Sequence, residues 1–185
     1  MSGFSDMYCI FAEPRDALAD QLRGEITHLA SKYGTQPFKP HVTVLGSIER
    51  PREEVMALAR EAASKIKPFR INLSRVAQGP SHYVCVYIAV AQEEGAMAAG
   101  MTARQVFGVP SKPYMPHLSL VYADMGDDVK AQAVEYENAR LFGTDPATRI
   151  LDTGFDVDRL TVWYVPEDDP SLASWTRVAE IPLSG

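Results

Sequence analysis

Cysteine is scarce in this sequence, and each of its two copies lies in an apolar stretch. Cys9 and Cys85 are the only cysteines among 185 residues, which excludes a disulfide-rich extracellular framework. We interpret both as buried free thiols, because free cysteine packs as a small apolar side chain. This cysteine usage favours a reducing compartment, and we expect a cytoplasmic protein.

Long apolar runs and an excess of basic residues are also absent. No stretch approaches the ~20 apolar residues that a membrane-spanning helix needs, and residues 1–6 do not resemble a secretory signal. The 18 lysines and arginines are outnumbered by 24 aspartates and glutamates, which gives a net charge of −6. Sequence-independent binding of long nucleic acid needs a basic surface. A small phosphorylated substrate needs only a few local donors.

Several well-known nucleotide and hydrolase motifs are missing. The chain contains no Walker A loop, no dinucleotide-binding glycine fingerprint and no nucleophile elbow. Its hydrophobic content of 46% and charged content of 23% are those of an ordinary globular protein. The length suits one domain, or two small lobes that share a core.

A short pattern that occurs twice is the most informative feature of the chain. It runs aromatic, any residue, proline, histidine, apolar, hydroxyl, apolar, and it covers residues 38–44 and 114–120. The residues in it that carry chemistry, called the motif residues below, are His41, Thr43, His117 and Ser119. One histidine near one hydroxyl arises often by chance, whereas matched flanks at two places favour a shared role.

The alternation within each copy predicts a strand. Successive side chains of a strand point to opposite faces, so each histidine shares a face with the hydroxyl two residues later. The intervening apolar residues point into a core, and the proline before each histidine suits the first residue of a strand. Because imidazole exchanges protons near neutral pH, we expect two acid–base groups and two hydroxyls to converge on one cleft.

Helical and strand patterns follow an order that occurs twice. After a strand at 8–11, the chain is predicted to form a helix, a histidine strand, a helix and two strands, and the same order recurs from residue 93. This predicts an α+β fold of two similar lobes, each an antiparallel sheet with helices outside, facing across a central cleft. We expect one bilobal domain over residues 1–185, with pseudo-repeat halves at about 7–90 and 93–182.

Local patterns place the remaining turns and strands. Glycines predict turns at residues 46–47 and 78–81. The returning strand of a hairpin is then expected at 83–90, and two closing strands at 160–165 and 175–181.

Apolar spacing also indicates which residues of two predicted helices face the core and which face solvent. A helix capped by Asp127 is predicted with Val129, Ala133 and Tyr136 as its apolar positions. His28 lies beside the apolar stripe of the first helix, so we interpret it as a solvated surface residue.

Two histidines on two strands suit the in-line cleavage of a phosphodiester, above all a strained cyclic one. Hydrolysis needs a base that takes a proton from water and an acid that protonates the leaving oxygen, on opposite sides of phosphorus. Hydroxyls on the same faces supply donors for the charged non-bridging oxygens. This chemistry requires no metal or other cofactor. The sequence alone does not decide which histidine is the base.

Two rival interpretations of the repeated pattern stay open. Each histidine could be a hydrogen-bonded structural residue of a half-buried strand. A zinc site would need three or four ligands, and the hydroxyls ligate poorly. His82 is a candidate third ligand, but Tyr83 beside it would then face the other way. We therefore expect no metal at the motif residues.

At these residues the chain resembles a known family. Residues 40–44, 85–87 and especially 112–123 are similar to the plant-type cyclic phosphodiesterases. These belong to the 2H phosphoesterase superfamily, which is named for two His-x-(Thr/Ser) motifs. The similarity extends over nearly the whole chain in length and element order, and it is weak in the helices and in the C-terminal third.

The resemblance implies a function and a set of roles. It implies opening of ADP-ribose 1″,2″-cyclic phosphate, which arises during tRNA splicing, to ADP-ribose 1″-phosphate, and of nucleoside 2′,3′-cyclic phosphates to 2′-phosphates. His41 and His117 would be catalytic, and Thr43 and Ser119 would bind phosphate. It also implies that Tyr122 borders the phosphate and that Tyr83 stacks on a base or ribose, although both could be ordinary half-buried aromatics.

The expected partner is a small cyclic-phosphate nucleotide, with no long nucleic acid, no membrane and no second copy of the chain. Lys39 and Lys112 flank the motifs and are expected to be rim charges. An RNA-end-processing enzyme of the same superfamily, of the 2′-5′ RNA ligase or cyclic-end type, is the main alternative. The acidic balance disfavours it, since an RNA strand favours a basic track. A non-catalytic nucleotide-binding module is the third possibility.

Overall fold

One antiparallel sheet organises the protein. The computed structural model describes residues 6–110, 112–150, 152–166 and 168–185, so residues 1–5, which belong to the N-terminus discussed above, lie outside it. Within those ranges eight strands form the order β6-β3-β4-β5-β2-β1-β7-β8. The strands are β1 (Met7–Ala12), β2 (Val42–Glu49), β3 (Phe69–Ser81), β4 (Val84–Val90), β5 (His117–Val121), β6 (Gly154–Val157), β7 (Arg159–Tyr164) and β8 (Thr176–Pro182).

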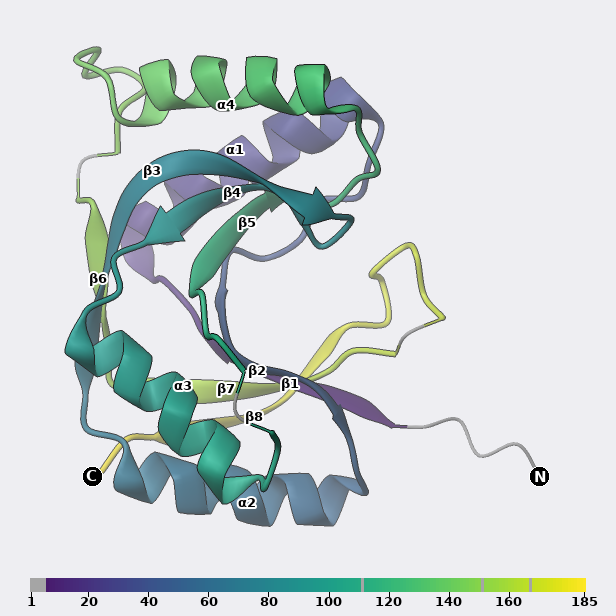
Figure 1. Ribbon diagram of the computed structural model, residues 1–185, viewed down its shortest axis with the longest axis vertical. Coiled ribbons are helices and arrows are strands. Elements are labelled where there is room, and N and C mark those ends of the chain that lie inside the picture. Colours follow the sequence, from purple (N-terminus) through teal and green to yellow (C-terminus); the bar gives the residue numbers. More distant parts are fainter. Residues whose placement is uncertain (1–5, 111, 151, 167) are drawn as a thin grey trace.

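Four helices in the described ranges cover this sheet in two pairs. They are α1 (Asp16–Tyr33), α2 (Arg52–Lys65), α3 (Glu94–Val106) and α4 (Asp127–Leu141). α1 and α4 lie over β5, β4 and β3, at the top of Figure 1, while α2 and α3 lie over β2, β7 and β8 at the bottom. We call these halves the β5 lobe and the β2 lobe. The predicted α+β fold of two lobes is confirmed.

The two lobes do not coincide with the two halves of the sequence. α1 follows β1 of the β2 lobe but packs against β5, and α3 follows β4 of the β5 lobe but packs against β2. β3 likewise pairs with β4 and with β6, which comes from far along the chain. Residues 7–90 and 93–182 therefore each contribute to both lobes.

The helix predictions from apolar spacing hold for the first two helices. α1 buries Leu22, Ile26 and Leu29 and ends at Gly34, whose backbone adopts a left-handed φ of 68° and donates to Ala30 O. Glycine reaches this conformation without the steric cost that a Cβ would bring. α2 follows Pro51, which occupies its N-cap.

The fourth helix buries only one of its three predicted apolar positions, Ala133. Its inward positions are Lys130, Ala133, Glu137 and Leu141, whereas Val129 and Tyr136 are exposed. Asp127 is the first helical residue and Gly126 occupies the cap. Apolar spacing failed here because two ionisable side chains stand on the buried stripe.

Two predicted turns and the strand count also needed correction. Gly46-Ser47 lies inside β2 as a bulge, since the register with β1 shifts there and Ser47 takes a φ of 54°. β3 continues through residues 78–81 with a second register shift, and the hairpin turns at His82-Tyr83 instead. β6 was missed because its four residues follow a loop rich in turn-forming residues.

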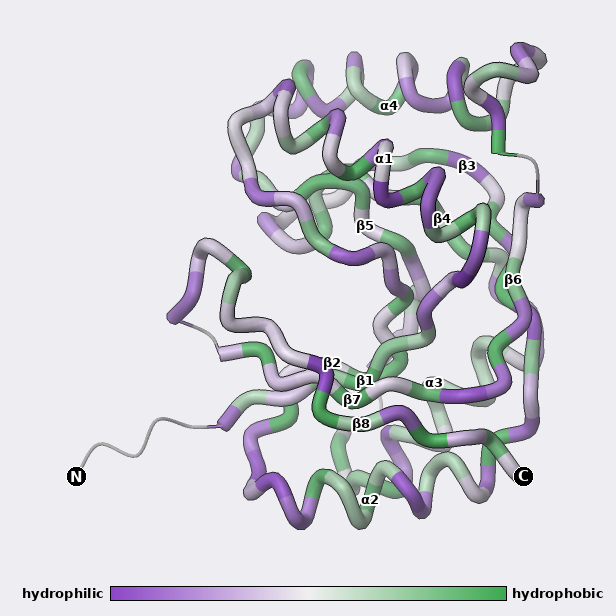
Figure 2. The backbone as a smooth tube through the Cα atoms, turned by 180° about the vertical axis from the view of Figure 1, so that it is seen from behind, coloured by the Kyte–Doolittle hydropathy of each residue, from purple (hydrophilic) through white to green (hydrophobic). Residues whose placement is uncertain are grey.

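The core runs continuously through both lobes. Nearly all buried apolar side chains of the sheet and helices belong to one cluster, which contains strand residues such as Ile10, Val42, Ile88 and Leu118. Figure 2 shows hydrophobic colours along the strands, whereas α2 and α4 at the two ends alternate between hydrophilic and hydrophobic. No helix among the described residues has the length and apolar character required to cross a bilayer.

Candidate active site

The motif residues meet where the two lobes join. β2 and β5 are antiparallel neighbours, and Val42 of β2 lies opposite Leu118 of β5. Antiparallel pairing then sets the flanking residues opposite each other on the other face of the sheet. The pairs are His41 with Ser119 and Thr43 with His117. The two histidines are thus diagonal neighbours, a relation that typically separates residues by about 7–8 Å.

The backbone fixes both imidazole rings in the same way. Nδ1 of His41 lies 2.7 Å from Lys39 O, and Nδ1 of His117 lies 3.0 Å from Met115 O, in each case two residues back. A carbonyl accepts only, so Nδ1 carries the proton in both rings and Nε2 is left to exchange one. Both rings therefore present their reactive nitrogen in the same tautomer.

Their surroundings differ. His41 is only 5% exposed, and its ring stacks on Phe11 at 3.8 Å between centroids. Burial is the main reason that the pKa of His41 falls to about 4, with the nearby His117 as a smaller contribution in the same direction. The hydrogen bond to Lys39 O opposes this shift. His41 is therefore a neutral imidazole at pH 7. His117 is less deeply placed, since its side chain is only half-buried.

Three hydroxyls border the histidines. Ser119 is buried and donates to Tyr83 O at 3.2 Å, and Thr43 is half-buried. Tyr122 Oη lies 3.4 Å from Nε2 of His41. Burial raises the pKa of the Tyr122 phenol well above its usual range, so it stays protonated and able to donate. Tyr122 therefore lies beside the reactive nitrogen of His41, and its expected role beside a phosphate stays a prediction.

Tyr83 occupies the rim of the same region. It stands in the turn between β3 and β4, is 53% exposed, and meets Tyr122 edge-to-face at 5.3 Å between ring centroids. An exposed ring beside a buried site is available for stacking. His82 next to it pairs with Asp124 at 3.1 Å.

A pocket beside His41 contains residues that the sequence did not single out. Its volume is about 510 Å³, and its walls include Phe11, Trp163, Trp175 and Arg177, together with Lys39 from the expected rim. Nζ of Lys39 lies 5.5 Å from the Trp163 ring. Phe11 and Trp163 belong to ordinary apolar strands and Trp175 to a loop, so no local sequence signal distinguishes them.

A smaller pocket adjoins this one and is lined by charged side chains. Its volume is about 240 Å³, and it shares Lys39 and Arg177 with the larger pocket. The other cationic side chains on its walls are Arg15, Arg23 and Arg159. Glu13 and Glu180 also line it, and each of its arginines is ion-paired with a carboxylate of Glu13, Asp20, Asp158 or Glu180. The pocket thus gathers guanidinium groups within a network of ion pairs.

The motif residues do not form part of a metal-ligand cluster in the described ranges. There, the three-residue grouping of His, Cys, Asp or Glu whose ligand atoms approach one another lies on α1 and α4. Lys112, the second predicted rim lysine, is exposed. Cys9 and Cys85 are both free, as predicted, but only Cys85 is fully buried, since Cys9 is half-buried in β1. Desolvation raises the pKa of the Cys9 thiol to about 11.

Comparison with known proteins finds similarity along nearly the whole chain. The model of the 2′-5′ RNA ligase superfamily matches residues 12–169. A protein of Arabidopsis thaliana named cyclic phosphodiesterase is 27% identical over 180 residues, which are 97% of this chain and 96% of the plant protein.

Solved structures with this fold include bacterial proteins. E. coli LigT in its apo form superposes with a TM-score of 0.64 at 16% identity, covering 97% of this chain and 98% of LigT. The protein TT0787 of Thermus thermophilus superposes with a TM-score of 0.65 at 18% identity, covering 97% and 98%. At these identities the likeness concerns the fold.

Proposed function

Because the chain belongs to the 2′-5′ RNA ligase superfamily, we propose that it hydrolyses cyclic phosphodiesters of small nucleotides with His41 and His117 as an acid–base pair. The match bears out the resemblance to the 2H phosphoesterases, a superfamily of enzymes. The observation that carries the proposal is the register at Val42 and Leu118, which puts both histidines and both hydroxyls on one face.

The proposed reaction uses the two rings in turn. Nε2 of His41 takes a proton from water as the water oxygen forms a bond to phosphorus. The bond from phosphorus to one ring oxygen of the cyclic ester breaks, and His117 gives that oxygen its proton. One water is consumed, and exchange with solvent restores both rings. General acid–base catalysis of this kind typically contributes 10²–10⁴-fold per group.

The burial of His41 supports this assignment of roles. A general base must be neutral before the reaction, and the lowered pKa of about 4 keeps His41 neutral over the physiological range. Thr43, Ser119 and Tyr122 are the neutral donors for the negative oxygens of phosphorus. Both histidines come from one chain, so the proposed site needs no residue from a second copy.

The two adjoining pockets suggest the substrate. The aromatic pocket beside His41 suits a base or ribose, since bases commonly stack on aromatic side chains. Lys39 and Arg177 connect it to the charged pocket, where a diphosphate would find donors. E. coli LigT, which has the same fold, was solved with NADP⁺, itself a dinucleotide. We therefore favour ADP-ribose 1″,2″-cyclic phosphate, formed in tRNA splicing, with nucleoside 2′,3′-cyclic phosphates as smaller substrates.

A substrate panel in EDTA tests the proposal. It contains ADP-ribose 1″,2″-cyclic phosphate, the four nucleoside 2′,3′-cyclic phosphates and a short RNA with a 2′,3′-cyclic end. The small substrates are expected to turn over without added metal. Because both cysteines are free thiols, the assay buffer should contain a reductant, as the expected cytoplasmic setting would. Loss of activity in EDTA that zinc or manganese restores would contradict the metal-free scheme. Preference for the RNA would favour the RNA-end function, and no turnover would favour a binding module.

A double variant tests the diphosphate contact. K39A/R177A should raise KM for the ADP-ribose substrate about 10–100-fold, the effect of losing charge-assisted hydrogen bonds of ~1.5–3 kcal/mol. KM for a nucleoside cyclic phosphate, which has no diphosphate, should change little. K112A alters an exposed lysine near the other motif and is the matched control. Equal effects on both substrates would contradict a diphosphate subsite.

A further inference from the structure

Two buried carboxylates face each other between α1 and α4, remote in sequence from the histidine motifs. Glu25 on α1 is 6% exposed and Glu137 on α4 is fully buried. Neither oxygen of Glu137 has a hydrogen-bond partner, and Oε1 of Glu25 has none either. Buried polar atoms are almost always paired, and an unpaired buried charge is costly. In the geometry of the structure these three oxygens have no hydrogen-bond partner.

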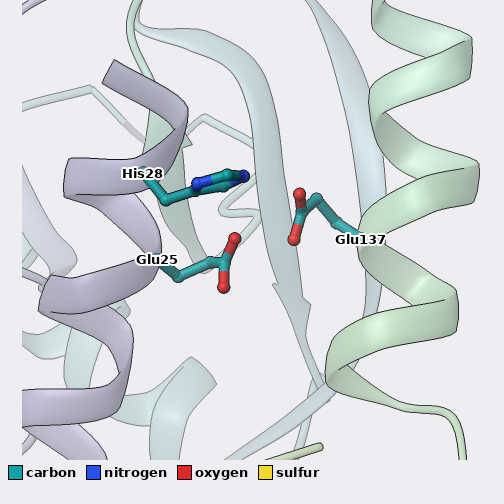
Figure 3. Close-up of side chains that lie close together, drawn as sticks. All are labelled: Glu25, His28 and Glu137. Atoms are coloured by element: carbon teal, nitrogen blue, oxygen red, sulfur yellow. The ribbon is translucent and has the colours of Figure 1, made fainter. Parts of the chain in front are cut away.

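A histidine completes the group. His28 follows Glu25 by three residues, so both side chains lie on the same side of α1. One ligand atom from each of Glu25, His28 and Glu137 lies within 4.8 Å of the other two. Figure 3 shows the imidazole and the two carboxylates turned toward one shared space between the helices.

The surrounding cations balance only part of this charge. Nη2 of Arg140 lies 2.9 Å from Oε2 of Glu25, and its Nε is 3.9 Å from Oε2 of Glu137. Lys32 is directed at aromatic rings, with Nζ 4.7 Å from the centroid of the Tyr136 ring. Burial and the neighbouring Glu25 raise the pKa of the Glu137 carboxyl to about 8. One arginine thus faces a carboxyl pair of which three oxygens still lack a partner, in a buried space that a cation would fit.

We propose that Glu25, His28 and Glu137 form a binding site for a zinc-type divalent cation, with water as its fourth ligand. Imidazole together with carboxylates is a donor set that suits zinc, whereas magnesium favours an all-oxygen shell. Zinc bonds of about 2.0–2.2 Å place neighbouring ligand atoms roughly 3.3 Å apart, so the three side chains need to close by about 1.5 Å at most. Arg140 can then remain on the outer side of Glu25 as an orienting partner.

The bound ion would brace the β5 lobe. α1 packs on β5 and α4 on β3 and β4, all in the upper half of Figure 1, and the two helices come from distant parts of the chain. An ion held by both helices links them without reaching the motif residues. His28, an exposed residue with no role in the sequence analysis, then becomes a ligand.

Thermal unfolding with zinc chloride tests the site. At a zinc concentration 100-fold above the dissociation constant, Tm of the wild type should rise by about 5–10 °C. H28Q and E137Q should lose this rise, and metal analysis should fall from about one zinc per chain to none. In metal-free buffer E137Q should melt at or above the wild type, because an amide is neutral in this buried place without having to hold a proton. Magnesium chloride should produce no rise in any variant.

Matched controls separate this site from other zinc ligands. E135Q makes the same chemical change at an exposed position of α4, and H82Q does so for an exposed histidine, so both should keep the zinc-dependent rise. H41Q/H117Q should keep it too, which separates the result from the proposed hydrolysis. An unchanged wild-type Tm in zinc, or a rise that persists in both H28Q and E137Q, would overturn the proposal and leave a protonated carboxyl pair as the explanation.

Discussion

At the scale of single residues, the two histidines have the same attachment and different surroundings. Each ring is held by a carbonyl two residues back, so attachment cannot distinguish their roles. Phe11 stacks on His41 and Tyr122 lies against its reactive nitrogen, and this burial keeps His41 neutral. The sequence pattern identified the pair, whereas the difference within the pair arises from residues distant in the chain.

Alanine substitutions should separate proton transfer from hydrogen bonding. H41A or H117A should lower kcat by roughly 10²–10⁴-fold, because each removes a general acid or base. T43A and S119A should each cost about 1.5–3 kcal/mol of transition-state stabilisation, the range for hydrogen bonds to charged groups. Steady-state kinetics on a nucleoside 2′,3′-cyclic phosphate measures both. Equal and mild losses in all four variants, with circular dichroism unchanged, would argue against a catalytic pair.

The pH profile should show the lowered pKa of His41. As base, His41 must be neutral, so kcat/KM should fall only as pH drops through about 4. On the alkaline side kcat/KM should fall as the acid loses its proton. In H41Q the acid limb should disappear from the residual activity. An acid limb that survives in H41Q but vanishes in H117Q would reverse the two roles.

The burial of His41 also makes the free energy of unfolding depend on pH. In the unfolded chain an ordinary histidine takes up a proton below pH 6.5, whereas folded His41 does so only near pH 4. The folded state is therefore favoured most above pH 6.5 and loses up to about 3 kcal/mol as pH falls from 6.5 to 4. Urea unfolding at each pH measures this loss. H41Q should show a smaller loss across that window.

At the scale of elements, α3 packs closely against Tyr114, which lies just before β5 and connects it to β2. Tyr114 donates to Thr43 O at 2.9 Å and so connects the segment before β5 to β2. A Cβ on Gly100 of α3 would lie 2.4 Å from the Tyr114 ring, so glycine is needed for this close contact.

G100A should disturb both stability and catalysis. Overpacking of this kind typically costs about 1–3 kcal/mol, and displacement of Tyr114 should lower kcat as well. Urea unfolding and kinetics on the same preparation measure the two effects. G24A is the matched control, because a Cβ at Gly24 in α1 meets nothing within 4 Å and should stabilise by about 0.5–1 kcal/mol. Wild-type behaviour of G100A would show that Tyr114 can move without consequence.

Local patterns predicted most elements because they depend on local chemistry. The apolar spacing in α1 and the alternation of side chains in β2 and β5 correctly predicted the type of each element and the face that it buries. Where tertiary contacts decide, local patterns failed: Gly46-Ser47 bulges inside a paired strand, and α4 turns Glu137 inward although Tyr136 is more apolar. The aromatic pocket was missed for the same reason, since Phe11, Trp163 and Trp175 meet only in the folded chain.

At the scale of the whole molecule, the chain crosses between the lobes several times. α1 and α3 each pack on the lobe opposite to the strand that precedes them. One continuous core also extends through both lobes. Neither lobe can therefore complete its packing while the other is unfolded.

The protein should accordingly unfold in one transition. Trp163 and Trp175 both report on the β2 lobe, whereas far-ultraviolet circular dichroism follows the helices of both lobes. The two signals should give coincident urea curves, the test for two-state behaviour. A fragment of residues 1–91 should lack cooperative unfolding. Curves with separate midpoints, or a folded fragment, would show that the lobes are independent.

In the proposed scheme, the unequal burial of the two histidines also bears on the regiochemistry of the product. A cyclic phosphate has two ring oxygens, and in-line attack expels the one opposite the entering water. If His41 always activates the water, then the orientation of the sugar between the lobes alone selects the oxygen that leaves on the side of His117. A substrate bound in the reverse orientation would yield the other positional isomer. The isomer ratio of the monophosphate product thus measures how strictly the aromatic pocket beside His41 orients its ligand.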